Sequence, residues 1–464
     1  MQNQMTKPYF LLLFGLILGG CKIAQKAAAP ALEWTERNEP LSVIRHGIPA
    51  YGKTDVLYKQ NGRKKYRVTL GEPAVVSVAD KVEEWGFFQF PTIAGTANGA
   101  ILAKWHMAKD AMESYGNTLS PSSISTDGGK TWQQNPKSWE ETGADEGLLL
   151  PNGDRIKILT PTPLKESELA MPKSLGSITR RKYEHKFFKL TELPASRQGV
   201  FLARRKKGET AWQEEHAALD DPQALRYSLR GMVPVVWWGD MKVAADGAVV
   251  ACIYPGFHIR EDGSVDPKGG VFFYRSTDSG KSWKILSRIP YQPDTKIDTN
   301  GVNKYWFTEP AFEILADGTY LSVIRSHDIY SGPMYASRST DQGKTWTKPK
   351  VITPNGVLPR LLQLENGVTV VSAGRPGVQL RFSNDGKGET WTNGFEMMPF
   401  DAFESLPFEV SDRGKTEPVS CGYTGLLATG PNKFLVIYSD FMHKNAQGQT
   451  RKAIKVREVT VAPL

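Results

Sequence analysis

A short motif that recurs along the chain constrains its fold more than any other feature of the sequence. The first copy is SISTDGGKTW, which ends at Trp132, and the later copies are STDSGKSW at 276–283, STDQGKTW at 339–346 and SNDGKGETW at 383–391. In each copy the Asp side chain can accept hydrogen bonds from the backbone of its own turn, Gly permits the turn's backbone angles, and Trp packs beneath. We therefore predict tight hairpin turns held by structural aspartates, namely Asp127, Asp278, Asp341 and Asp385.

Turn dipeptides divide the rest of the chain into short, strand-rich runs. They are Asn98-Gly99, Asn152-Gly153, Asp246-Gly247, Asp317-Gly318, Asn366-Gly367 and Pro431-Asn432. Asn-Gly and Asp-Gly are strong short-range signals for a β-hairpin. Four of these hairpins are followed by the motif, the second by a degenerate copy that ends at Trp212, and the last by the strand KAIKVREVTV. Six hairpins, each with a second strand pair, predict an all-β fold of the six-bladed β-propeller type.

Three segments need separate interpretation. No long helical period occurs, so 163–171 and 214–225 are expected to be at most short loop helices. Residues 42–78 either form a seventh blade or supply closing strands that pair with the C-terminal strand. We favour the closing strands because such pairing removes exposed sheet edges.

The N-terminus indicates export. Lys7 precedes an apolar run too short to span a bilayer, and this run ends in the sequence LGGC at Cys21. The ending resembles a bacterial lipobox, which implies cleavage before Cys21 and lipid attachment to it. An ordinary signal peptide with a chance Cys is the alternative. We expect a lipoprotein signal peptide at 1–20, a tether at 21–40, a single domain at 41–464, and a lipid-anchored location in the bacterial cell envelope.

Composition limits the partners. The net charge of +9 is modest for 464 residues and is compatible with anionic glycans or an anionic surface. The basic residues are dispersed, so no nucleic acid is expected, and we predict a monomer that contacts the membrane only through its lipid. No metal-ligand spacing occurs, and we expect neither a metal nor another cofactor. Cys252 and Cys421 are either buried free thiols or one disulfide.

The turn dipeptides also give a register along the strands. Residues about eight positions from a turn lie roughly 26 Å away along the strand, at the opposite rim of the fold. Residues at this offset are therefore expected to share one site. The register selects Gln89, His106, Glu309, Arg325, Arg375 and Tyr423, and it places Asp110, Asp240 and Arg360 near the same level.

The segments that carry these residues resemble those of the bacterial sialidases (neuraminidases), which are six-bladed propellers with several Asp boxes. TEPAFEILADGTYLSVIR resembles the segment in which a Glu opens one strand and an Arg ends the next, which implies these roles for Glu309 and Arg325. CGYTGLLATGPNKFLVIYSD resembles the segment with the tyrosine nucleophile, which implies that role for Tyr423. GRPGVQLRFS places Arg375 near the family's third arginine, with Arg360 as a competitor. The similarity covers nearly the whole mature chain.

The resemblance implies an exo-glycosidase that removes a terminal acidic sugar from a glycan. A sialic acid carries a carboxylate on the carbon that is attacked, so a neutral phenol avoids the repulsion that a carboxylate nucleophile would meet. Glu309 would take the phenolic proton of Tyr423, and the arginines would bind the substrate carboxylate. Asp110 is the candidate for the acid that protonates the leaving oxygen.

The chain also departs from the family's pattern. The family opens its first blade with Arg-Ile-Pro, where this chain has Gln89-Phe90-Pro91. An amide brings no charge, so one charge-assisted hydrogen bond of about 1.5–3 kcal/mol would be missing. Arg45 is a candidate to replace it. His106 adds an acid/base group that is unexpected in a sialidase site, and we assign it, with Asp240, to substrate binding.

Two other functions stay open on the sequence. One is a lyase or hydrolase that acts on a uronic-acid-containing glycan, and the other is a glycan-binding propeller without turnover. The tryptophans near the expected site are either a platform for the sugar or core residues; they are Trp105, Trp237, Trp238 and Trp306.

Overall fold

The computed structural model describes most of the chain from residue 64 onward. The described residues are 36–37, 54–60, 64–111, 114, 120–180, 183–233, 237–298, 301–303, 306–326, 332–375, 377–392, 394–398 and 419–463. Helical segments among them are limited to the 3-10 turns Glu166–Glu168, Leu190–Glu192, Ala195–Arg197 and Gly301–Asn303. The predicted all-β class is therefore confirmed.

Two of the four sheets follow the order of the chain. The smaller one consists of β5 (Phe87–Gly95), β6 (Ile101–Met107), β7 (Ser122–Ser125) and β8 (Gln133–Gln134). The larger one consists of β22 (Thr308–Ile314), β23 (Tyr320–Arg325), β24 (Gly332–Ser339), β25 (Lys350–Gln363), β26 (Thr369–Gly374), β27 (Val378–Ser383) and β28 (Phe395–Glu396). Strand β25 pairs with β24 through its first part and with β26 through its second part.

The largest sheet joins two antiparallel runs. One run is β9 (Leu148–Leu149), β10 (Arg155–Ile158), β14 (Val200–Arg205) and β15 (Gln213–Asp220), and the other is β18 (Trp237–Val243), β19 (Val249–His258), β20 (Gly270–Ser276) and β21 (Ser282–Ile289). They meet where β15 pairs parallel to β21. The sheet continues beyond β19 through β16 (Ala224–Leu229), β13 (Tyr183–Lys189), β12 (Gly176–Arg180), β17 (Met232–Val233) and β11 (Leu164–Lys165).

The two ends of the chain share the fourth sheet. It contains β1 (Glu36–Arg37), β2 (Thr54–Gln60), β3 (Lys64–Leu70), β4 (Ala74–Val78), β29 (Thr424–Gly430), β30 (Lys433–Lys444) and β31 (Thr450–Pro463). Both β3 and β4 pair antiparallel with β31. The N-terminal strands therefore pair with the C-terminal strand, as expected.

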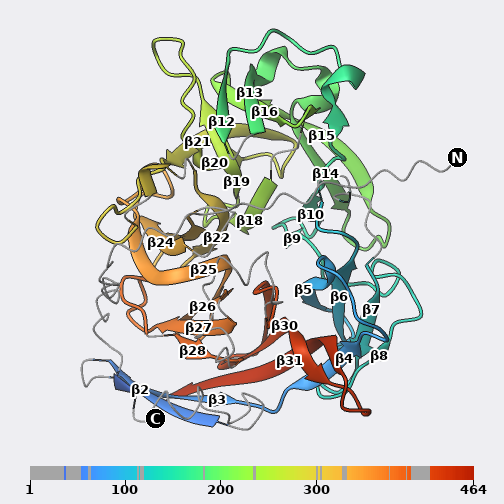
Figure 1. Ribbon diagram of the computed structural model, residues 1–464. Helices are drawn as coiled ribbons and strands as arrows, with labels where there is room; N and C mark the ends of the chain where they lie inside the picture. Colours follow the sequence, from blue (N-terminus) through green and yellow to red (C-terminus); the bar gives the residue numbers. More distant parts are fainter. Residues whose placement is uncertain are drawn as a thin grey trace, which may run out of the picture.

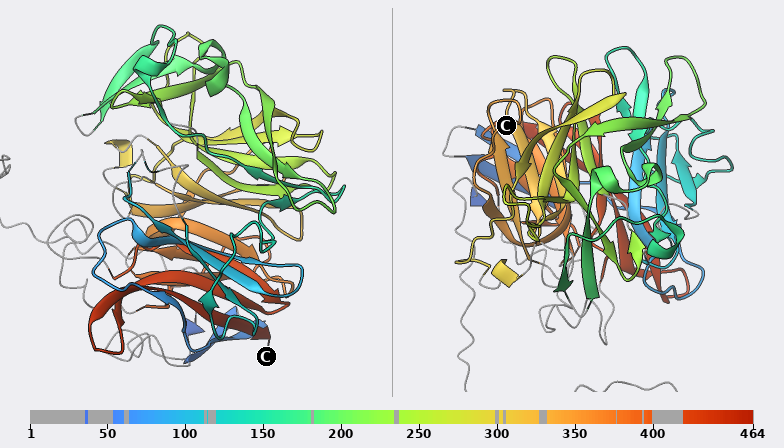
Figure 2. Two further views of the ribbon diagram at one scale, coloured as in Figure 1. Left: turned by 90° about the vertical axis from the view of Figure 1, so that its right-hand side faces the viewer. Right: turned by 90° about the horizontal axis from the view of Figure 1, so that it is seen from above.

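The strand groups follow one another around a centre (Figure 1), while β12, β13 and β16 project at the top of the view and of its side view (Figure 2, left). This arrangement is typical of a propeller. However, the described strands form four sheets and not six separate ones. The count of six blades thus remains a prediction.

The predicted turns join paired strands. Asn98-Gly99 lies between β5 and β6, and the other five dipeptides likewise lie between the strands β9 and β10, β18 and β19, β22 and β23, β25 and β26, and β29 and β30. The five glycines of these turns have φ between 82° and 89°, a region open to Gly without a steric penalty. The turn chemistry therefore placed these hairpins correctly.

The repeated motif forms the turns that its sequence predicts. Asp127 accepts hydrogen bonds from the Ser125 hydroxyl (2.8 Å) and from the N–H groups of Lys130 (3.0 Å) and Thr131 (2.9 Å). The same bonds to the preceding Ser and to the turn backbone are made by Asp278, Asp341 and Asp385. These turns follow β7, β20, β24 and β27, so the motif has a structural role.

One secondary-structure prediction was wrong. Residues 214–225 form most of β15 and the start of β16, where we expected at most a short helix. Burial alternates along β15, but its less exposed positions are Glu215, Ala217 and Leu219, so the sequence shows no clear apolar alternation. Its backbone is satisfied on both sides, by β14 and by the distant β21, which a local pattern does not reveal. Residues 163–171 contain β11 and the 3-10 turn Glu166–Glu168.

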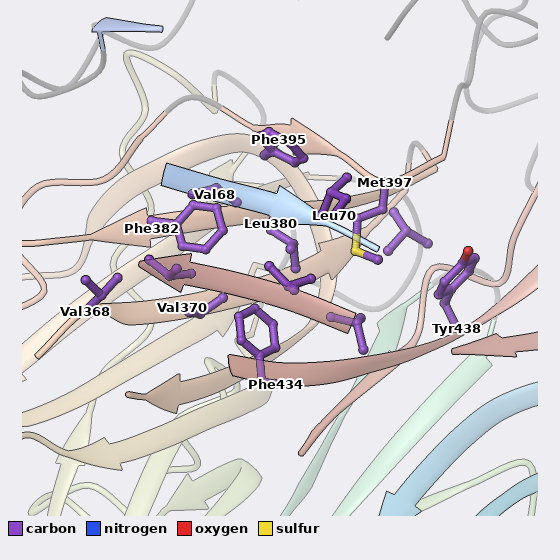
Figure 3. Close-up of a cluster of buried hydrophobic side chains, with 14 of the residues drawn as sticks. Val68, Leu70, Val368, Val370, Leu380, Phe382, Phe395, Met397, Phe434 and Tyr438 are labelled. Carbon is purple, nitrogen blue, oxygen red and sulfur yellow. The ribbon is translucent and has the colours of Figure 1, made fainter. Parts of the chain in front are cut away.

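The N-terminal strand β3 is fixed by core packing as well as by pairing. Its Val68 and Leu70 are 1% and 2% exposed and pack in one cluster with residues of β26, β27, β28 and β30 (Figure 3). Val370, Leu380 and Phe434 of these strands are fully buried in the same cluster. Burying such side chains contributes about 1.5–3 kcal/mol each, so the cluster holds the two ends of the chain together.

Candidate functional site

Glu309 and Arg325 form a buried ion pair at the ends of two adjacent strands. Nη1 of Arg325, at the end of β23, lies 2.9 Å from each carboxylate oxygen of Glu309, near the start of β22. The N–H of Leu358 in β25 donates to the same carboxylate at 2.8 Å. Arg325 is 2% exposed and Glu309 8%. The carboxylate of Glu309 is therefore held in place by donors from two neighbouring strands.

A recurrent β-bulge places these side chains. In β5, β18, β22 and β25 two residues stand opposite one residue of the partner strand. Within three of these bulges Phe90, Glu309 and Leu358 have positive φ angles of 50°, 48° and 37°, and each precedes a Pro. Such backbone costs on the order of 1–3 kcal/mol and clusters at functional sites. The bulges therefore turn Glu309 and its counterparts out of the regular strand alternation.

Tyr423 contacts Glu309 although it lies 114 residues further along the chain. It lies directly before β29, and its hydroxyl donates a hydrogen bond to Oε1 of Glu309. Burial and, after it, the charge of Glu309 raise the pKa of Tyr423 well above its usual value. The phenol therefore keeps its proton in the resting site and has the acceptor for that proton in contact. The ring of Phe90 packs against that of Tyr423, with the two ring centroids 4.8 Å apart.

Arg375 is the second guanidinium beside this tyrosine. It directly follows β26, its Nε donates to the carbonyl of Cys421 at 3.1 Å, and its side chain is 8% exposed. The guanidinium carbon lies 5.9 Å from the ring centre of Tyr423 and 5.4 Å from that of Trp85. A positive charge is thus fixed next to the phenol.

Asp240 and Arg360 form an ion pair that is longer and more exposed than that of Glu309 and Arg325. Nη1 of Arg360 lies 3.7 Å from Oδ1 of Asp240, and Oδ2 of Asp240 accepts the N–H of Phe312 at 3.0 Å. Both side chains are partly exposed. Because an exposed pair adds little stability, these charges remain able to meet a ligand.

The register missed Tyr254. Burial raises the pKa of this tyrosine, the charge of Glu309 adds to that effect, and Arg360 and Arg325 act against it. The charges of Glu309 and Arg325 thus act on Tyr254 as they do on Tyr423. It is eight positions after Asp246, the offset that selected His106 and Arg325, so the signal was present in the sequence.

Gln89 and His106 face each other across β5 and β6. Gln89 is completely buried, and neither its amide oxygen nor its amide nitrogen has a hydrogen-bond partner among the described residues. The same holds for Nε2 of His106. Burial lowers the pKa of His106, against backbone contacts and the charge of Asp110, so its ring is neutral at pH 7. The ring centroid of Phe90 lies 5.4 Å from that of His106, which connects this pair to Tyr423.

Asp110 lies at the exposed edge of the site. The indole N–H of Trp85 donates to its Oδ2 at 2.9 Å, and its charge acts on the pKa of His106. Of the loop that carries it, 112–113 and 115–119 lie outside the described residues. The structure thus places Asp110 beside Trp85 and His106, next to the residues around Tyr423.

The other candidates fall into three groups. Cys21, Arg45 and the side chain of Trp237 lie outside the described residues. Trp105 and Trp306 are 5% and 4% exposed and are therefore core residues and not a sugar platform, whereas Trp238 is partly buried and packs edge-on against Trp283. Cys252 and Cys421 are both buried free thiols, which decides between the two alternatives for them.

Within the described ranges, no cluster of three or more His, Cys, Asp or Glu side chains could hold a metal ion. In the same part of the chain, no helix combines the length and the apolar character needed to cross a bilayer.

Comparison with known proteins gives similarity in structure only. No family model matches the sequence, and no curated protein matches it. A solved protein of unknown function from Dyadobacter fermentans is 19% identical, with a TM-score of 0.56 over 85% of this chain and 99% of that one. An α-L-arabinanase from Penicillium chrysogenum is 14% identical (TM-score 0.44; 83% and 98% covered), and the Hadza microbial sialidase Hz136 is 16% identical (TM-score 0.43; 89% and 73% covered). The likeness to the Dyadobacter protein shows that the two chains share a fold.

Proposed function

We propose that this chain is a glycosidase of sialidase type on a six-bladed propeller, which hydrolyses a terminal acidic sugar from a glycan. The observation that carries the proposal is the hydrogen bond from the Tyr423 hydroxyl to Glu309. A phenol with a raised pKa is a weak nucleophile unless a base in contact takes its proton as it attacks. Glu309 is such a base, and Arg325 fixes its position.

The reaction would proceed in two steps. In the first, the phenolic oxygen of Tyr423 attacks the anomeric carbon, its proton passes to Glu309, and the bond to the leaving oxygen breaks as Asp110 donates a proton to that oxygen. In the second, water attacks the same carbon, Asp110 takes the water's proton, and Tyr423 leaves and recovers its own proton from Glu309. The sugar is released with net retention of configuration.

The acidic sugar is supported by the charges around Tyr423. The guanidinium of Arg375 lies beside the phenol, and that of Arg325 donates to the carboxylate of Glu309, which the phenol also contacts. A substrate carboxylate next to the attacked carbon would be stabilised there by charge-assisted hydrogen bonds, each worth about 1.5–3 kcal/mol. A neutral phenol would approach such a carbon without repulsion.

The test is covalent trapping by a fluorinated sialoside, followed by intact mass. The wild-type chain should gain the mass of one sugar on Tyr423, and Tyr423→Phe should gain none and lose turnover. Tyr438→Phe is the matched control, because its hydroxyl lies in the core with no hydrogen-bond partner among the described residues. Full turnover by Tyr423→Phe would rule out the nucleophile.

A second candidate is a lyase or hydrolase that acts on a uronic-acid-containing glycan. It is favoured by the neutral His106 beside Gln89, where the sialidase pattern has an arginine. A lyase would yield an unsaturated product that absorbs in the ultraviolet. No such absorbance across a set of uronate polymers would exclude the lyase.

The place of action is proposed on the N-terminal sequence alone. We propose that the protein is exported, lipid-anchored at Cys21 and monomeric in the bacterial cell envelope. Metabolic labelling with a fatty-acid analogue would test the anchor. Cys21→Ser should abolish the label.

A further inference from the structure

Three buried polar atoms beside Tyr423 are without partners in the described part of the chain. They are the amide oxygen and nitrogen of Gln89 and Nε2 of His106. The two residues are directly opposite each other in β5 and β6, so their side chains leave the same face of the sheet. Phe90, which directly follows Gln89, packs against the rings of both His106 and Tyr423.

Leaving such groups unpaired is unfavourable. A buried donor or acceptor without a partner costs about 1–3 kcal/mol, and Gln89 alone has two such atoms. An apolar residue of the same shape would avoid this cost. The Gln89 amide at this position is therefore explained if a ligand supplies the missing partners.

The chemistry of these atoms identifies the kind of partner. The amide of Gln89 offers one acceptor and a donor NH₂ group, and a neutral imidazole offers one donor or acceptor at Nε2. Neither carries a charge. A group that both donates and accepts, such as a sugar hydroxyl, satisfies them, whereas a carboxylate could only accept.

The two charged guanidiniums lie on another side of Tyr423 than Gln89 and His106. Arg325 faces the carboxylate of Glu309, and Arg375 lies over the ring of Tyr423. Full charges are thus located on the β22, β23 and β26 side of the phenol. On the β5 and β6 side, Gln89 and the neutral ring of His106 carry no charge, and the charge that acts on His106 is that of Asp110 in the loop after β6.

We propose that Gln89 and His106 form an uncharged subsite that binds a hydroxyl group of the sugar held against Tyr423. The subsite rests on the proposed function and specifies its substrate. The sugar would present its carboxylate to the arginines and a hydroxyl to this pair, so only two arginines would share the carboxylate. Selectivity for that hydroxyl would come from the cost of leaving the pair unpaired.

Binding, and not turnover, tests the subsite. The probes are the methyl glycosides of N-acetylneuraminic acid and of glucuronic acid, each with the analogues in which one hydroxyl is replaced by hydrogen, measured by titration calorimetry. For the parent sugar that binds more tightly, one deoxy analogue should bind the wild-type chain at least about tenfold more weakly. In Gln89→Leu and in His106→Leu this penalty should be smaller, because each variant keeps only one partner for the hydroxyl, and in the double variant parent and analogue should bind within about twofold of each other.

A stability measurement separates this role from a structural one. Gln89→Leu should unfold at the wild-type temperature or above, because it removes unpaired buried atoms. Gln198→Leu is the matched control, since the amide nitrogen of Gln198 donates to the carbonyls of Thr191 and Leu193 and the loss of these bonds should lower the unfolding temperature.

Several outcomes would overturn the subsite. They are failure of both parent sugars to bind, a deoxy penalty that is undiminished in Gln89→Leu or persists in the double variant, and destabilisation by Gln89→Leu as large as that by Gln198→Leu. Failure of the proposed function is a different result. In that case the fluorinated sialoside leaves Tyr423 unlabelled while the hydroxyl preference and its loss in Gln89→Leu are still measured.

Discussion

Nη1 of Arg325 lies 2.9 Å from both carboxylate oxygens of Glu309. One nitrogen of the guanidinium thus neutralises a carboxylate that also accepts hydrogen bonds from Tyr423 and from the N–H of Leu358. Two charges buried to this degree depend on each other, because neither has enough water to stabilise it alone. The pair therefore links the stability of the fold to the position of the proton acceptor for Tyr423.

Removing one member of this pair should be costly. We expect Glu309→Gln to lower the free energy of unfolding by about 3–5 kcal/mol, since it removes the carboxylate that the buried guanidinium of Arg325 contacts through Nη1. Urea unfolding of the variant and of the wild-type chain measures this difference in the free energy of unfolding. Glu458→Gln is the control: Glu458 pairs with Lys433 at 3.0 Å, but both side chains are more than 40% exposed, so the loss should be about 0–1 kcal/mol. Equal losses would contradict the buried pair.

The position of Tyr423 depends on a close approach between two glycines. A Cβ on Gly374, at the end of β26, would overlap the Cα and the carbonyl of Gly422, the residue before Tyr423. Gly374→Ala should therefore displace the phenol and lower kcat by about a hundredfold, as a displacement of ~1 Å can do. Gly95→Ala is the control, because a Cβ there has no atom within 4 Å, and it should keep full activity. Wild-type kcat in Gly374→Ala would show that the approach is not needed.

The convergence of the site was predictable because the strand period and the turns are local properties. Counting from Asp317-Gly318 selected Glu309 and Arg325, and these two are in contact. The same count paired Gln89 with His106, which the strand register confirms. A strand has a fixed rise per residue, so a turn determines where each residue lies along it.

What the sequence did not reveal depends on contacts between distant segments. The bulges that rotate Glu309 and Leu358 need a positive φ, for which these residue types have no preference. The pairing of β15 with β21 joins residues far apart in the chain and was not foreseen. Tyr254 fits the eight-residue offset from Asp246, but tyrosine is common in strands, so its residue type does not distinguish a site residue from a packed one.

The turn aspartates should give the fold a specific acid sensitivity. Hydrogen bonds from Ser339 and then from Thr345 lower the pKa of Asp341 to about 2, from an unfolded value of 3.8. A depressed carboxyl pKa stabilises the fold above the unfolded pKa, and this contribution is lost as the pH falls through the folded pKa. The stabilisation by Asp341 should thus be complete above about pH 5 and disappear towards pH 2.

Asp341→Asn isolates this effect. The variant should unfold at a lower temperature than the wild-type chain at pH 6, and the gap between their unfolding temperatures should narrow as the pH is lowered from 4 towards 2. Differential scanning calorimetry at each pH measures the gap. A gap that stays constant over this range would show that the Asp341 carboxylate is not stabilised in the turn.

The two cysteines should remain reduced even in an oxidising compartment. Cys252 and Cys421 are free and 0% exposed, and burial followed by the charge of Asp240 raises the pKa of the Cys252 thiol well above its usual value. A protonated, buried thiol does not react, because the thiolate is the nucleophile. In a Cys21→Ser chain purified without reductant, an aromatic disulfide reagent should label neither thiol in the native state and both after unfolding in urea. Labelling that appears only after a reductant is added would mean that the two had formed a disulfide, and the packing of Cys421 beside Tyr423 would then differ from that described.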